Sequence, residues 1–124
     1  MRLRWGISAA VLVSLLFGLM LARTACAREA TPGAIVGNPD NFDGQTVTIR
    51  GTVTNLRTTV SRKGNPYYTY DLRQGDHAVR VFSFGKPTCL EGSPATVEGR
   101  FTKTKRISGR TFYNEVEANT TRCN

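Results

Sequence analysis

Alternation of polar and apolar residues with a period of two is the feature that most constrains this chain, because it predicts strands. In the segment 45–54 one face carries three β-branched apolar residues: Val47, Ile49 and Val53. The other face carries threonines and Arg50, as in a half-buried strand. Gly51 stands on the apolar face and suits a sharp bend or a close backbone approach. The alternation then shifts by one residue, which predicts a β-bulge near Thr54–Asn55.

Four further segments show the same alternation between clusters of turn-forming residues. They span residues 67–72, 77–84, 95–102 and 111–118. Gly75 and Asp76 predict a hairpin turn between the first two of these. We expect loops at 61–66, 86–94 and 103–110, and no long window carries apolar residues at helical spacing. Five strands, the first long and bent, predict a small closed barrel, because an open sheet would leave two edges exposed.

The first 27 residues have the composition of a secretory signal peptide. Arginines stand near the start, residues 7–21 are apolar or small almost throughout, and Ala25–Cys26–Ala27 is a small-x-small triplet. We expect cleavage after Ala27 and a periplasmic or secreted mature chain. A retained membrane anchor is disfavoured, since this apolar run falls short of the roughly 20 residues that span a bilayer. Acylation of Cys26 is a minor alternative, because Arg23 stands where a bacterial lipobox usually carries leucine.

The predicted mature chain divides into three parts. Residues 28–43 form an N-terminal lead-in that starts with a flexible stretch, residues 44–118 form the barrel, and residues 119–124 form a C-terminal tail. Once Cys26 has left with the signal peptide, Cys89 and Cys123 are the remaining cysteines. An exported protein meets an oxidising compartment, so we expect these two to form a disulfide.

Several short motifs in residues 44–118 resemble OB-fold domains of the nucleic-acid-binding type, and the small exported bacterial versions in particular. The motifs are the glycine and valine run of 44–55, the aromatic strand ending in Asp71–Leu72, the segment Val79–Arg80–Val81–Phe82 and the segment Val97–Glu98–Gly99–Arg100–Phe101. The resemblance implies an all-β, five-stranded Greek-key barrel. The helix that usually joins strands three and four is absent or minimal, because residues 86–94 are broken by prolines and a glycine. We expect the disulfide to substitute for that helix as a plug.

The resemblance also implies a binding face on strands two and three, framed by the loops that join strands one and two and strands four and five. The predicted ligand-binding residues are Arg50, Arg62, Lys63, Tyr67, Arg80, Phe82, Lys103, Lys105, Arg106 and Arg110. Phosphates would meet the basic groups, and bases would stack on the rings. Tyr68 and Tyr70 share the phase of Leu72 and are predicted core residues. A second interpretation places Phe82 and Phe84 over a barrel end.

Seventeen Lys and Arg against nine Asp and Glu give a formal net charge of +8, which favours acidic partners. The first hypothesis is an exported module that binds single-stranded nucleic acid or another polyanion. The alternative is a structural or interaction protein of the cell envelope whose barrel binds a protein or a glycan. We expect no enzymatic activity, cofactor or metal site. His77 is the sole histidine, and Asp71, Asp76 and His77 around one hairpin are typical turn residues.

Overall fold

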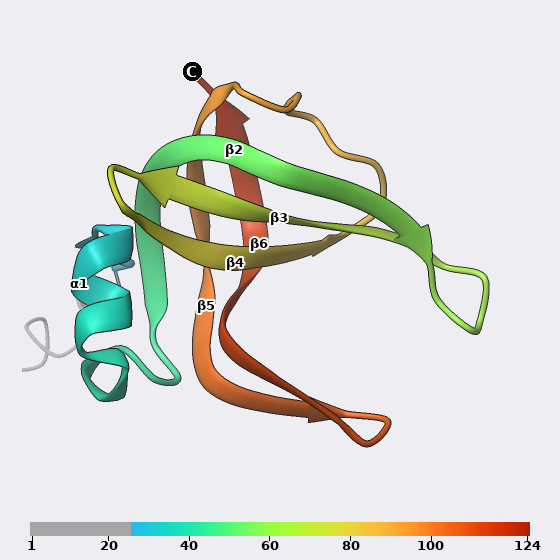
Figure 1. Cartoon of the computed structure of the whole chain (residues 1–124), viewed down its shortest axis with the longest axis horizontal. Coiled ribbons are helices and arrows are strands. Elements are labelled where there is room, and N and C mark those ends of the chain that lie inside the picture. The colour runs from blue at the N-terminus through green and yellow to red at the C-terminus, as the bar shows by residue number, and fades with distance from the viewer. Residues whose placement is uncertain (1–25) are drawn as a thin grey trace, which may run out of the picture.

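The computed structural model describes residues 26–124, most of which lie in six β-strands (Figure 1). In chain order the elements are β1 (Arg28–Ala30), α1 (Pro32–Gly37), the 3-10 turn η3 (Pro39–Asn41), β2 (Thr46–Val60), β3 (Pro66–Gln74), β4 (His77–Phe84), β5 (Pro94–Ile107) and β6 (Arg110–Cys123). Apart from Cys26 and Ala27, the predicted signal peptide lies outside the described residues. Within residues 26–124 no helix has the length and apolar character needed to cross a membrane.

The strands close into a ring, which confirms the predicted all-β barrel. Around the ring β2 pairs with β3, β3 with β4, β4 with β6, β6 with β5, and β5 with β2. All of these pairings are antiparallel except that of β4 with β6, where the chain crosses over. All five predicted strands are present, and no helix interrupts residues 85–93 between β4 and β5.

The apolar residues of the alternating segments fill the interior of the barrel. Its most buried side chains include Val47, Ile49, Val53, Leu72, Val79, Val81, Val97, Phe101 and Val116. Tyr68 and Tyr70 are buried with them, as their phase predicts. Burial of one such large apolar side chain contributes about 1.5–3 kcal/mol. The barrel is therefore held together mainly by its inward-facing residues, and its outward faces are left for other uses.

Two glycines allow the long strands β2 and β5 to approach their neighbours closely. A methyl group at Gly51 would lie 2.7 Å from the carbonyl oxygen of Arg73, and one at Gly99 would overlap the carbonyl oxygen of Glu117. A side chain at either position would push the paired strands apart. The prediction that Gly51 marks a close backbone approach is confirmed.

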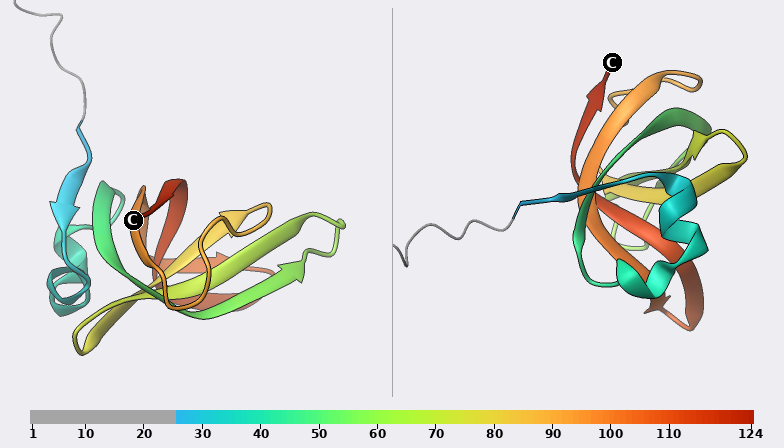
Figure 2. Two further views of the ribbon diagram at one scale, coloured as in Figure 1. Left: turned by 90° about the horizontal axis from the view of Figure 1, so that it is seen from above. Right: turned by 90° about the vertical axis from the view of Figure 1, so that its left-hand side faces the viewer.

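Residues 28–43 contain two elements that the sequence analysis missed. β1 pairs in parallel with β2, and α1 starts after Thr31, whose hydroxyl oxygen accepts a hydrogen bond of 3.1 Å from the Ala34 N–H. Thr31–Pro32 places a preferred N-cap residue before a proline in the first turn, which is a helix-start signal. Ile35 on α1 is fully buried, and α1 lies across the side of the barrel that faces the viewer in Figure 2, right. The helix thus covers the barrel, a role that the sequence analysis gave to the disulfide.

The loop expected at 103–110 is instead the end of a long hairpin. β5 continues to Ile107 and β6 starts at Arg110, so Ser108 and Gly109 alone make the turn, with φ values of 50° and 79°. Two positive φ values are typical of a type I′ turn, whose twist matches that of the flanking strands. Threonines alternate with basic residues before the turn, and their β-branched side chains favour strand.

The predicted disulfide between Cys89 and Cys123 is present. Strand β6 runs as far as Cys123, so the tail expected at 119–124 is strand except for Asn124. Cys89 is buried in the core, and the bond ties the loop 85–93 to the end of the last strand. This crosslink therefore fastens the C-terminal end of the barrel.

Candidate functional site

Two hairpin arms project from the barrel on the side away from α1. The first arm comprises residues 57–66 at the end of β2, and the second arm comprises residues 104–113 around the turn between β5 and β6. Figures 1 and 2 show both arms reaching in the same general direction, with β3 and β4 adjoining them. No residue of either arm is buried. The arms therefore frame the outward face of β3 and β4, where the resemblance implies a binding face.

The register of β3 and β4 decides which side chains share that outward face. Three directly opposed pairs lie there: Tyr67 with Phe84, Thr69 with Phe82, and Asp71 with Arg80. The residues between them, such as Tyr70 and Val81, are buried in the core, so the three pairs point outward, although Thr69 is itself only 8% exposed there. Successive pairs stand roughly 7 Å apart along the strands. The face thus divides into an aromatic part and a charged part.

Phe82 is the centre of an aromatic cluster in the first of these parts. Its ring centroid lies 5.2 Å from that of Tyr67 and 5.0 Å from that of Phe84, the latter edge to face. The ammonium group of Lys105, from the second arm, lies 4.8 Å from the Phe82 centroid. These neighbours leave Phe82 half-buried, whereas Phe84 is 63% exposed. Phe84 therefore offers a ligand more ring surface than Phe82 does.

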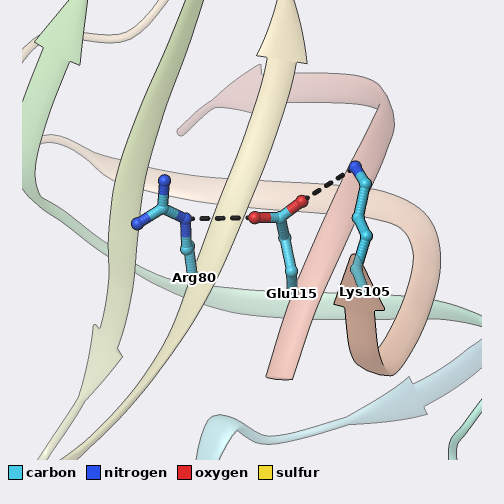
Figure 3. A network of polar contacts seen from close by, with 3 residues as sticks. All are labelled: Arg80, Lys105 and Glu115. Atoms are coloured by element: carbon cyan, nitrogen blue, oxygen red, sulfur yellow. Dashed lines mark hydrogen bonds and ion pairs between the residues drawn. The ribbon is translucent and has the colours of Figure 1, made fainter. Parts of the chain in front are cut away.

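A buried carboxylate organises the charged part of the face. The Glu115 side chain is 4% exposed and lies between Arg80 Nε, at 3.1 Å, and Lys105 Nζ, at 3.0 Å (Figure 3). A buried carboxylate needs such partners, because an unpaired buried charge is strongly destabilising. Arg80 also lies over the ring of Phe112, 5.2 Å from its centroid. The ion trio of Glu115, Arg80 and Lys105 thus joins the second arm to β4.

A polar hollow of about 300 Å³ opens on the charged part of the face. It is lined by Asn55, Arg57, Thr69, Tyr70, Asp71 and Arg80. Arg57 reaches it because the predicted bulge is present: the pairing of β2 with β3 shifts between Thr54 and Arg57, and Asn55 has a φ of 53°. The Glu91 carboxylate holds the bulge, since it accepts hydrogen bonds from the backbone N–H groups of Asn55 (3.0 Å) and Leu56 (2.8 Å).

The predicted ligand-binding residues fall into three groups in the structure. One group is linked on the outward face, directly or through Glu115: Tyr67, Arg80, Phe82 and Lys105. A second group is exposed near the tips of the arms: Arg62, Lys63, Arg106 and Arg110. The other two lie apart, because Arg50 lines a second hollow of about 340 Å³ beside β1 and Lys103 Nζ pairs with Asp40 at 2.7 Å. The Asp40 carboxylate, through this hydrogen bond, raises the pKa of Lys103.

Arg57, Glu115 and Phe112 are among the residues of the site that were not predicted. Arg57 was within reach of sequence reasoning, because the phase shift at the bulge turns the odd positions of β2 outward beyond it. Glu115 and Phe112 meet Arg80 only through the parallel pairing of β4 with β6 and the bend of the second arm. No local pattern in the sequence reveals either of these. Within residues 26–124 no group of three or more His, Cys, Asp or Glu side chains is placed to hold a metal ion.

The strand arrangement is shared with solved structures of low sequence identity. Yeast Stn1 and Ten1 matches with a TM-score of 0.60 and 10% identity, covering 79% of this chain and 63% of the matched chain. A proposed aspartyl-tRNA synthetase from Leishmania major matches with a TM-score of 0.59 and 15% identity, covering 92% of this chain and 25% of the other. A proposed nucleic acid-binding lipoprotein from Klebsiella pneumoniae matches with a TM-score of 0.54 and 16% identity. This chain has an OB fold.

The OB fold of this chain accounts for different shares of the three matched proteins. The chain spans less than two thirds of the first matched chain and a quarter of the second, but 91% of the Klebsiella protein, which in turn covers 78% of this chain. No protein-family model and no curated protein matches the sequence. At these identities the likeness shows the fold alone, and the site has to be interpreted from its own residues.

Proposed function

We propose that this chain is an exported OB-fold module that binds single-stranded nucleic acid across the outward face of β3 and β4. The observation that carries the proposal is the joint placement of aromatic and cationic side chains on one face between two basic arms: Tyr67, Arg80, Phe82, Phe84 and Lys105. Single strands suit such a surface, because phosphates attract Lys and Arg while every base presents a ring that can stack. The Klebsiella protein of the same fold is described as nucleic acid-binding, which supports the proposal.

The two parts of the face have different roles in this proposal. Phe84 and Tyr67 stand directly opposite each other and form the stacking surface, with Phe82 as its support. The basic residues near the arm tips meet phosphates along the strand. Lys105 is already held by Glu115, so it loses little conformational freedom when a ligand arrives. The proposal assigns binding to the chain and no catalytic step.

Fluorescence anisotropy with the purified protein tests the proposal. The probes are a labelled single-stranded oligonucleotide of roughly 12 nucleotides, within the usual site size of OB folds, a duplex of the same sequence, and a heparin fragment of matched charge. We expect the single strand to bind most tightly, because the duplex hides its base faces and the glycan has no aromatic ring to stack. Equal affinity for heparin would assign the face to polyanions in general. Absence of binding to the single strand at low salt would reject the proposal.

The alternative function, an interaction module of the cell envelope, is favoured by one observation. Apolar side chains are exposed on the arms, namely Val60, Ile107 and Tyr113, and such residues suit a protein partner. Affinity capture from an envelope extract, with and without nuclease treatment, separates the two functions. A protein partner that is still captured after nuclease treatment favours this alternative. Capture that is lost after nuclease treatment favours the first proposal.

Export is the part of the proposal that rests on the N-terminal sequence. The apolar run, the basic start and Ala25–Cys26–Ala27 support cleavage after Ala27. Intact-mass measurement of the protein recovered from outside the cytoplasm should give a chain starting at Arg28. A chain that starts at an acylated Cys26 would instead make the protein a membrane-anchored lipoprotein.

A further inference from the structure

The polar hollow on the charged part of the face contains hydrogen-bond donors that residues 26–124 leave unused. Among residues 26–124 Arg57 has no hydrogen-bond or ion-pair partner, and Arg80 uses only its Nε, toward Glu115. Figure 3 shows the two terminal nitrogens of Arg80 pointing away from Glu115. Both arginines line the hollow. Several N–H donors are therefore available there to a ligand.

Acceptors line the same hollow and are held in place. The Asn55 side-chain amide donates from Nδ2 to Asp71 Oδ2 at 2.9 Å, which leaves Asp71 Oδ1 without a partner among residues 26–124. Asn55 is itself fixed at the bulge, because Glu91 accepts its backbone N–H. The bulge thus orients Asn55, and Asn55 orients Asp71, before any ligand is present. Groups held in this way cost a ligand less ordering entropy.

The Asp71 carboxylate decides which ligand group suits the hollow. A phosphate would meet a negative charge there, whereas the edge of an uncharged base can place its donors on Asp71 and its acceptors on the arginines. Guanine is the base that joins two adjacent acceptors, O6 and N7, to two adjacent donors, N1–H and the exocyclic amine. The acceptors match the fork of an arginine, and the donors match a carboxylate.

We propose that the polar hollow reads one unstacked guanine of a bound single strand, with Arg57 and Arg80 donating to O6 and N7 and Asp71 accepting from N1–H and the exocyclic amine on the adjoining Watson–Crick edge. This inference rests on the proposed function and makes it more specific. Neighbouring bases stack on Phe84 and Tyr67, in the aromatic part of the same face. The hollow therefore sets sequence preference, while the aromatic part and the arms set affinity.

Competition binding with single-base substitutions tests the inference. The probes are four labelled single strands, each a run of thymidines with dG, dA, dC or dT at the central position. The full-length mature protein should bind the dG strand about fivefold to a hundredfold more tightly than the other three, since one matched base contact discriminates by about that factor. All four strands should bind with similar salt dependence, because their phosphates are identical.

Asp71→Asn is the decisive variant, and Glu117→Gln is its matched control. In Asp71→Asn the side-chain oxygen stays on Asn55 and an amide NH₂ faces the hollow, so guanine meets a donor in place of an acceptor. The preference for dG should disappear. Glu117 is exposed on β6, opposite Phe82, and lies outside the hollow, so its substitution removes the same charge. Glu117→Gln should keep the preference and bind all four strands somewhat more tightly, whereas Asp71→Asn should gain affinity only for the three strands without dG.

A second pair of variants guards against a folding defect in Asp71→Asn. Arg57→Met removes a donor from an exposed side chain that has no partner among residues 26–124, so its melting temperature should be unchanged. Its dG preference should fall at least threefold. Arg100→Met removes the same charge from an exposed site on β5, outside the hollow, and should keep the preference.

The outcomes separate the inference from the function on which it rests. Equal binding of the four strands by the wild-type protein, or a dG preference that survives both Asp71→Asn and Arg57→Met, would overturn the guanine site and leave single-strand binding intact. Loss of the preference in both hollow variants, with both controls unaffected, supports it. If the wild-type protein binds none of the four strands at low salt, the proposed function fails and the inference fails with it.

Discussion

The barrel and its two arms are made from the same strands yet differ in what stabilises them. Along β5 the residues Ala95, Val97 and Phe101 are fully buried in the barrel, whereas the continuation of the strand in the second arm has no buried residue. The barrel is stabilised by apolar packing, and the arms mainly by strand pairing and local polar contacts. A substitution in the barrel therefore changes stability, and one in an arm is free to change binding.

The arms also differ from each other in how they are fixed to the barrel. The first arm leaves β2 at the bulge, where Glu91 holds the backbone of Asn55. The second arm is joined to β4 through the buried Glu115, which pairs with Lys105 and Arg80. The backbone anchor of one arm and the ion trio of the other have the same effect. Both arms are fixed at the edges of the outward face before a ligand binds.

The largest expected difference in stability comes from removing one phenylalanine from each side of the sheet, one in the barrel core and one on the outward face. Phe101→Ala should lower the free energy of unfolding by about 3–5 kcal/mol, because it opens a cavity in the core. Phe84→Ala should lower it by less than about 1 kcal/mol, since the ring is mostly exposed. Urea unfolding followed by circular dichroism measures both. Similar losses in the two variants would mean that Phe84 covers the barrel, as the second sequence interpretation had it.

The disulfide tests whether the barrel depends on a covalent tie in addition to its packing. Replacing Cys89 and Cys123 together by serine should cost about 3–4 kcal/mol, because the bond closes a loop with a sequence separation of 34. The melting temperature should fall by several degrees, and the reduced wild-type protein should melt like the variant. Single-strand binding measured well below the melting temperature should be unchanged, since neither cysteine lies on the outward face. A loss of binding there would show that the crosslink also positions the arms.

Much of the barrel was predictable from the sequence, for a physical reason. A strand with one buried face has to alternate apolar and polar residues, so Val47, Ile49 and Val53 predict both the strand and its inward side. The phase shift at Asn55 and the glycine at position 51 predict the bulge and the close approach in the same local way. The disulfide followed from the expectation of an oxidising compartment and of two cysteines left after the predicted cleavage.

The parts that were missed depend on signals that are short or not local. Thr31–Pro32 marks the start of α1, but a helix of one or two turns has no periodicity to detect. Ser108–Gly109 is compatible with a loop as well as with a two-residue hairpin turn. Glu115 could not be assigned to Arg80 and Lys105, because their meeting depends on which strands become neighbours in the closed ring. Strand phase therefore predicted which side chains share the outward face, but not the contacts among them.

Removal of the exposed Phe84 ring tests how much the outward face contributes to single-strand affinity. Phe84→Ala should weaken single-strand binding by about 1–3 kcal/mol, the contribution of one stacked base, with little change in salt dependence. Tyr113→Ala is the matched control, because Tyr113 is an exposed aromatic residue of the second arm outside the three opposed pairs. Anisotropy titrations at two salt concentrations measure both variants. Equal losses would mean that any exposed ring on this side stacks, and no loss in either would remove the stacking role.

Tyr70 offers a smaller test within the barrel. Its hydroxyl is buried without a hydrogen-bond partner among the described residues. Burial raises the pKa of Tyr70 to about 12, even though the Thr121 side chain has a smaller effect that lowers this pKa. Tyr70→Phe should leave stability at pH 7 unchanged or raise it by about 1 kcal/mol, because it removes an unsatisfied polar group. Between pH 10 and 12 the unfolded chain loses the tyrosine proton that the folded chain keeps, so the wild type loses stability as pH rises. Urea titrations should therefore show the advantage of Tyr70→Phe widening over that range, and a constant difference would contradict the shifted pKa.

The smallest expected effect is on the salt dependence of binding. Two double variants test it, one that removes cations from an arm and one that removes cations from elsewhere on the surface. Arg62→Ala with Lys63→Ala removes two cations from the turn of the first arm, whereas Arg50→Ala with Lys103→Ala removes two that lie beside β1 and against Asp40. If both arm residues meet phosphates, the slope of log affinity against log salt should become shallower by roughly 1.4, which is 0.7 for each lost phosphate contact. The second pair should leave the slope nearly unchanged, although both double variants lose the same net charge. Equal changes in the two slopes would mean that the strand responds to the overall field of a basic protein and that the arms have no special part in binding it.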